Sequence, residues 1–94
     1  MMINDLQIPA FRRGYRLQWE QAQDCHVILY PEGMAKLNES ATAILQQVDG
    51  KRSVGEVITV LNAQFPDAGG VDDDVKAFLI QACEQKWIIF REPA

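Results

Sequence analysis

The residues of this chain that could take part in chemistry are few, and their spacing does not form a catalytic set. The single histidine, His26, directly follows Cys25 at the start of an apolar run that favours a β-strand. Adjacent residues on a strand point to opposite faces, so these two side chains cannot act together as nucleophile and base. We therefore expect His26 to be a surface or half-buried strand residue, and the protein not to be an enzyme.

Three consecutive carboxylates, Asp72, Asp73 and Asp74, are candidate ligands of a metal ion. Successive helical residues point about 100° apart, and acidic side chains in a first helical turn stabilise the helix through its dipole. No other cluster in the sequence supplies the oxygen shell that a hard cation needs, and there is no Gly-rich phosphate loop. The sequence thus predicts neither a metal nor an organic cofactor.

Length and composition limit the remaining functions. Ninety-four residues are enough for one domain, and the formal net charge of −4 disfavours nucleic acid and anionic membranes as partners. The sequence has no apolar run long enough to span a membrane and does not begin like a signal peptide, which predicts a cytoplasmic protein. In that compartment Cys25 and Cys83 are expected to be reduced.

The first half of the chain has the pattern of a three-stranded antiparallel meander. Residues 15–20 alternate apolar and polar side chains, residues 25–30 are largely β-branched, apolar or aromatic, and residues 34–37 form a short third strand. Tyr30, Pro31, Glu32 and Gly33 fit a type I turn between the second and third strands. Residues 1–14 show no clear period, and we assign them to an N-terminal arm that lies over the domain or is partly disordered.

The second half predicts three helices, over residues 39–48, 54–65 and 72–86. Asn38 can cap the first helix, Ser53 and Glu56 form a capping box for the second, and Pro66 ends the second. Residues 87–90 are either an extra half-turn or a closing strand. Residues 15–94 would thus form a single α+β domain in which a three-stranded antiparallel β-meander is followed by three helices, a winged-helix-like arrangement.

The third predicted helix carries more apolar surface than one packing partner requires. A core stripe is formed by Val75, Phe78, Leu79 and Ala82. A second stripe, centred about 120° away, is formed by Lys76, Ile80, Cys83 and Trp87. Gln81 and Gln85 fall on the far side of the helix.

A groove along the second stripe would border residues 34–37 if these form an edge strand, and a peptide could then add to the edge by β-augmentation. The predicted peptide-binding residues are Met34, Ala35, Lys36, Leu37, Lys76, Ile80, Cys83 and Trp87. Alternatively, the meander or a second copy of the chain covers this stripe. A winged-helix DNA-binding role is disfavoured, because its reading helix would begin with three aspartates.

An ordered series of residues resembles the PqqD family of pyrroloquinoline quinone biosynthesis. The series consists of Leu29-Tyr30-Pro31-Glu32-Gly33, Leu37-Asn38, Ala41, Ile44-Leu45, Asp49-Gly50, Asp74-Val75 and Phe78-Leu79. The resemblance implies a peptide chaperone that binds the precursor peptide PqqA and presents it to the radical S-adenosylmethionine enzyme PqqE, without a cofactor of its own. The runner-up is a generic homodimeric interaction module that uses the same strand edge on itself.

Overall fold

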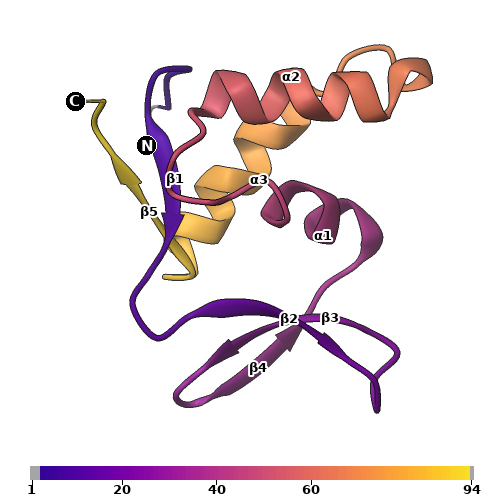
Figure 1. Cartoon of the computed structure of the whole chain (residues 1–94), viewed down its shortest axis with the longest axis vertical. Helices are drawn as coiled ribbons and strands as arrows, with labels where there is room; N and C mark the ends of the chain where they lie inside the picture. Colours follow the sequence, from indigo (N-terminus) through magenta and orange to yellow (C-terminus); the bar gives the residue numbers. More distant parts are fainter. Residues whose placement is uncertain (1–2, 94) are drawn as a thin grey trace.

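The computed structural model describes residues 3–93, along which four strands are followed by three α-helices and a fifth strand (Figure 1). The elements are β1 (Ile8–Phe11), β2 (Arg16–Glu20), β3 (Cys25–Tyr30), β4 (Gly33–Lys36), α1 (Glu39–Leu45), α2 (Val54–Gln64), the short 3₁₀ helix η1 (Pro66–Ala68), α3 (Asp72–Glu84) and β5 (Ile88–Arg91). This arrangement confirms an α+β fold with antiparallel strands and three helices. The likeness to a winged helix remains a prediction.

The meander consists of β2, β3 and β4 in that order, so β4 is an edge strand. Tyr30 pairs with Gly33, which leaves Pro31 and Glu32 as the two residues of the turn that the sequence predicted. Tyr15, just before β2, stacks on Tyr30 with the ring centroids 5.4 Å apart. Figure 1 shows the meander below the helices, with β4 running back toward the start of α1.

A second, two-stranded sheet joins the two ends of the chain. β1 pairs antiparallel with β5, so that Ile8 lies opposite Arg91 and Phe11 opposite Ile88. The closing strand, one of the two alternatives for residues 87–90, is thus the one observed. Part of the predicted arm, residues 8–11, is a strand of the fold, whereas Met1, Met2 and Ala94 lie outside the described residues. The sequence did not predict this strand, because a segment of four residues that includes a proline is too short to show a strand period. In addition, its partner strand lies at the other end of the sequence.

The first two helices begin where their capping residues predict, whereas α3 begins at Asp72 without a side-chain cap. The side chain of Asn38 accepts a hydrogen bond from the Ala41 amide at 2.8 Å. Ser53 and Glu56 form the reciprocal capping box of α2, and Pro66 follows its end and starts η1. The first and third helices end at Leu45 and Glu84, two or three residues before the predicted ends.

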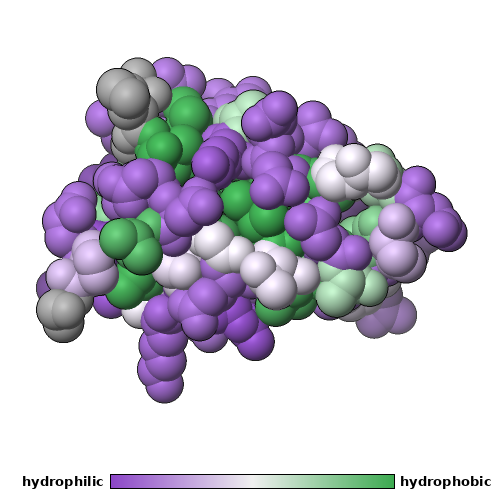
Figure 2. All heavy atoms as spheres, turned by 90° about the horizontal axis from the view of Figure 1, so that it is seen from above, coloured by the Kyte–Doolittle hydropathy of each residue, from purple (hydrophilic) through white to green (hydrophobic). Residues whose placement is uncertain are grey.

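One apolar core lies between the three helices and receives side chains from both sheets. Fourteen buried residues form it: Ile28, Leu37, Ala41, Ile44, Leu45, Val48, Val54, Val57, Ile58, Leu61, Val75, Leu79, Ala82 and Ile88. Burial of this apolar surface, at about 25 cal/mol per Å², is the main force that holds the meander against the helices. On the face seen from above in Figure 2, hydrophilic side chains surround smaller apolar patches.

Candidate functional site

The outer edge of β4 presents unpaired backbone groups. The Leu37 amide donates to the carbonyl oxygen of His26 at 3.0 Å, and the register pairs Ala35 with Ile28. In an antiparallel pair, the inward-facing backbone groups alternate along the strand. The N–H and C=O groups of Met34 and Lys36 therefore point away from β3, and both residues are exposed. Within residues 3–93, no strand pairs with this outer edge.

A groove of about 420 Å³ separates the end of β4 and the start of α1 from one flank of α3. Its lining is formed by Lys36, Leu37, Asn38, Ser40, Ala41, Ile44, Asp74, Phe78, Gln81, Gln85 and Trp87. Leu37 and Ile44 are buried at its floor, whereas Lys36 and Gln81 are exposed. The predicted residues Lys36, Leu37 and Trp87 thus meet at one groove, close to the outward-facing groups of β4.

The wall that α3 contributes to this groove differs from the predicted one. Asp74, Phe78, Gln81 and Gln85 line it, at positions i, i+4, i+7 and i+11. The core-facing residues of α3 lie next to this wall, and they are Val75, Leu79 and Ala82. Phe78 is half-buried and packs against the core while one part of it faces the groove. In the sequence, only the position of Phe78 at the margin of the core stripe indicated that this side of α3 could line a groove.

Lys76, Ile80 and Cys83 are not among the residues that line this groove. By the helical period they lie on the opposite flank of the core stripe, roughly 160° from the groove wall. All three are half-buried, and Lys76 forms an ion pair with Asp5 in which Nζ and Oδ1 are 2.8 Å apart. This hydrogen bond raises the pKa of Lys76 above its ordinary value of 10.5. The structure therefore places three of the four residues of the predicted second stripe away from this groove, and one of them, Lys76, against the N-terminal segment (residues 3–7).

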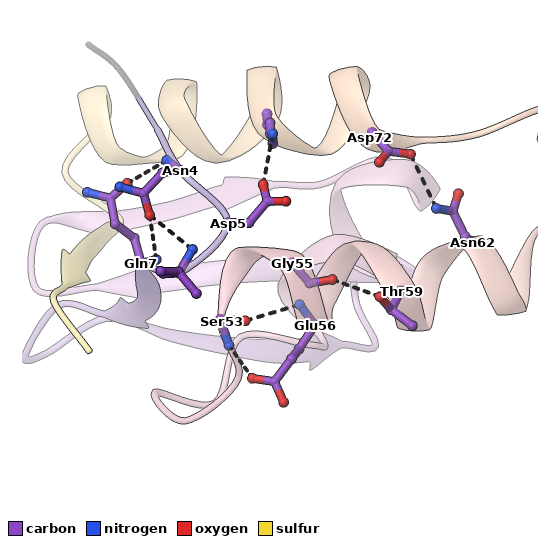
Figure 3. A network of polar contacts seen from close by, with 11 residues as sticks. Asn4, Asp5, Gln7, Ser53, Gly55, Glu56, Thr59, Asn62 and Asp72 are labelled. Carbon is purple, nitrogen blue, oxygen red and sulfur yellow. Dashed lines mark hydrogen bonds and ion pairs between the residues drawn. The ribbon is translucent and has the colours of Figure 1, made fainter. Parts of the chain in front are cut away.

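The N-terminal segment is held by the first turn of α2 as well as by α3. The amide of Gly55 donates to the carbonyl oxygen of Asp5 at 2.9 Å, and the amide of Val54 donates to that of Gln7 at 2.8 Å. Figure 3 shows Asp5 between the two helices, close to Gly55. The first amides of a helix have no partner within it, so these bonds satisfy groups that would otherwise require water.

The polar side chains with possible chemistry stay apart. His26 packs edge-on against Trp19, with the ring centroids 5.2 Å apart, and both cysteines are free thiols. Among residues 3–93, no three His, Cys, Asp or Glu side chains gather as a metal site would require. The pKa of Asp49 is lowered by the backbone amides of Arg52 and Lys51, which donate to its carboxylate as in a loop cap. No helix within the described part of the chain is long and apolar enough to cross a bilayer.

Comparison with protein families matches residues 25–88 to the family model described as coenzyme PQQ synthesis protein D (PqqD). Among the relatives is a PqqA binding protein from Kluyvera intermedia, 68% identical over 91 residues that cover 97% of this chain and 99% of the relative. Another, from Klebsiella pneumoniae strain 342, is 71% identical over 86 residues, covering 92% and 94% of the two chains.

Two solved structures share the fold. One is the PqqD truncation of Methylobacterium extorquens PqqCD, which is described as a functional and stand-alone recognition element for ribosomally synthesised and post-translationally modified peptides. It superposes with a TM-score of 0.75 at 25% sequence identity, and the match covers 94% of this chain and 95% of the other. PqqD from Xanthomonas campestris gives a TM-score of 0.51 at 31% identity, covering 90% and 96%. The family model, the relatives and the shared fold agree, and this chain belongs to the PqqD family.

Proposed function

We propose that this chain binds the precursor peptide PqqA as an added strand along β4. The observation that carries the proposal is the free edge of β4, where Met34 and Lys36 turn their backbone groups outward beside the groove to α3. Backbone hydrogen bonds along such an edge supply affinity, and side-chain pockets beside it supply specificity. The relatives described as PqqA binding proteins support this choice of peptide.

Within this site, the strand edge would be formed by Met34, Ala35, Lys36 and Leu37. The facing wall would be formed by Phe78, Gln81 and Trp87. Lys76, Ile80 and Cys83 belong to the site only if the bound peptide also extends around the other flank of α3. The two surfaces are distinct on the helix, so substitutions can test each one separately.

The protein would hold the peptide for modification rather than modify it. His26, Cys25 and the aspartates of α3 form no catalytic set, and the partner that carries out the chemistry would be the radical S-adenosylmethionine enzyme PqqE. Incubation of the pure protein with PqqA and S-adenosylmethionine, without PqqE, should leave the mass of the peptide unchanged. A modified peptide in that mixture would show that the chain itself is an enzyme.

Backbone NMR titration with synthetic PqqA tests the binding mode directly. The amides of Met34 and Lys36 should shift and become protected from exchange, because they would donate to the added strand. Size-exclusion mass with and without the peptide tests the alternative homodimer, in which a second copy occupies the same edge. Saturable PqqA binding with no change at β4 would locate the peptide site elsewhere.

A further inference from the structure

A second hollow, of about 390 Å³, opens where α1, the end of α2 and the start of α3 meet. It is lined by Glu39, Ser40, Ala43, Ile44, Leu61, Phe65, Ala68, Val71, Asp74 and Val75. Ser40, Ile44 and Asp74 also line the groove beside β4, so the two hollows adjoin at these three residues. A peptide that follows β4 toward α1 would pass this boundary.

The chemistry of this second hollow differs between its floor and its rim. Ile44, Leu61 and Val75 are buried below, and the ring of Phe65 stands at the wall with 47% of its surface exposed. Glu39 and Asp74 are exposed at the rim. The positively charged residue Lys36 lines the groove beside β4 but does not line this second hollow. An apolar floor under an acidic rim suits an apolar side chain with a positive charge beside it.

We propose that this hollow is a second subsite for the same peptide and accepts one large apolar side chain adjacent to a lysine or arginine of PqqA. The inference rests on the proposed function, because it requires the peptide to lie along β4. Two observations select the peptide as the occupant: the shared boundary with the groove beside β4 and the acidic rim. A second copy of this chain, with a formal net charge of −4, would bring further negative charge to that rim.

Filling the hollow tests the apolar part of the subsite. Ala68→Trp places an indole at the rim from an exposed position, and Ala63→Trp is the matched control on an exposed position of α2 outside the lining. Calorimetric titration with PqqA should show an affinity about tenfold or more lower for Ala68→Trp, the size of effect expected when one buried apolar contact is lost. Ala63→Trp should bind as the wild type does.

Two substitutions at the first turn of α3 test the acidic part. Asp74→Asn removes a rim charge, and Asp73→Asn removes a charge at the same helix end from a residue that does not line the hollow. Both variants lose a similar interaction with the helix dipole, so any difference between their affinities for PqqA reflects contact with the peptide. Asp74→Asn alone should weaken PqqA binding, by about two- to fivefold at low salt, with the difference shrinking as salt is added.

The two proposals fail differently. If Lys36→Pro abolishes binding while Ala68→Trp binds PqqA at wild-type strength, the peptide uses β4 but not the second subsite, whatever the effect of Asp74→Asn, because Asp74 also lines the groove beside β4. If PqqA binding is saturable but Lys36→Pro is also neutral, the proposed binding mode is wrong. If Ala68→Trp leaves PqqA binding intact but reduces capture of PqqE or changes the mass in solution, the hollow belongs to the enzyme or to a second copy.

Backbone NMR provides a further test of the subsite. The amides of Phe65 and Val71 should shift on addition of PqqA. The same amides should not shift with a PqqA variant whose apolar anchor is replaced by alanine.

Discussion

The amide of Leu37 donates to the carbonyl oxygen of His26 at 3.0 Å, and this bond fixes which backbone groups of β4 face outward. Because the bonding alternates along an antiparallel pair, Ala35 turns its amide toward Ile28 and Lys36 turns its amide away from β3. Two neighbouring residues of one strand are therefore not equivalent: the amide of Ala35 belongs to the sheet, whereas the amide of Lys36 is one that we propose to donate to the bound peptide.

We expect Lys36→Pro to abolish or strongly weaken PqqA binding while the protein stays folded. The substitution removes an amide that faces away from β3, and proline is tolerated on edge strands at such positions. Circular dichroism and calorimetric titration measure the two effects. Ala35→Pro is the control, since it removes an amide of the sheet and should lower the free energy of unfolding by about 1–3 kcal/mol. A folded Lys36→Pro variant with normal affinity would contradict strand addition.

Phe78→Ala and Ile80→Asp distinguish the two flanks of α3. Phe78 lines the groove beside β4, whereas Ile80 lies on the flank of Lys76 and Cys83. If the groove binds the peptide, Phe78→Ala should lower PqqA affinity at least tenfold, the loss of one large apolar contact.

Ile80→Asp should then stay within about threefold of the wild type, a difference below 1 kcal/mol. Phe78→Ala will also lower stability, because the ring packs on the core, so affinity should be measured well below its melting temperature. The reverse ranking of the two affinities would support the surface that the helical pattern predicts, formed by Lys76, Ile80 and Cys83.

Gly55→Ala should destabilise the protein, although alanine is the better helix former by about 1 kcal/mol. A Cβ at this position would lie 3.2 Å from the Cβ of Asp5 and 3.3 Å from its carbonyl oxygen. The N-terminal segment would have to move, and its bonds to the start of α2 would weaken. Thermal melts should show a lower melting temperature in the full chain. In a variant without residues 1–6 the same substitution should raise it, and stabilisation in both backgrounds would exclude this contact as the reason for glycine.

Lys76→Met should loosen the N-terminal segment without unfolding the domain. The ion pair with Asp5 is lost, and the Gly55 amide, which donates to the Asp5 carbonyl, should exchange faster with solvent. Because the folded protein raises the pKa of Lys76, the ion pair contributes stability below the ordinary value of 10.5 and loses it as the pH rises through the higher folded value. Hydrogen exchange at neutral pH and melting between pH 9 and 12 check both effects, with Lys51→Met as an exposed control. Equal exchange at Gly55 in the two variants would contradict the role of this ion pair.

Local signals in the sequence determined most of the elements. The turn of Tyr30 and Gly33, the cap Asn38 and the box of Ser53 and Glu56 act over a few residues, and the structure confirms each of them. β1 could not be predicted in this way. Its strand conformation depends on pairing with β5, about 80 residues later, and a four-residue segment carries no period that reports such a distant partner.

The sequence by itself also determined that α3 has a core face and that the residues after the turn form a short strand, whereas the edge position of this strand follows from the strand order of the sheet. It could not decide which flank of α3 faces that edge. The helical period fixes the angle between Phe78 and Ile80, but not the rotation of the whole helix relative to β4. Packing against α2 and β5 sets that rotation, and Asp5 lies against the flank of α3 that carries Lys76. Only the tertiary structure therefore placed Phe78 and Gln81 opposite Lys36, because burial of apolar surface depends on all the elements that pack in the core and not on one helix alone.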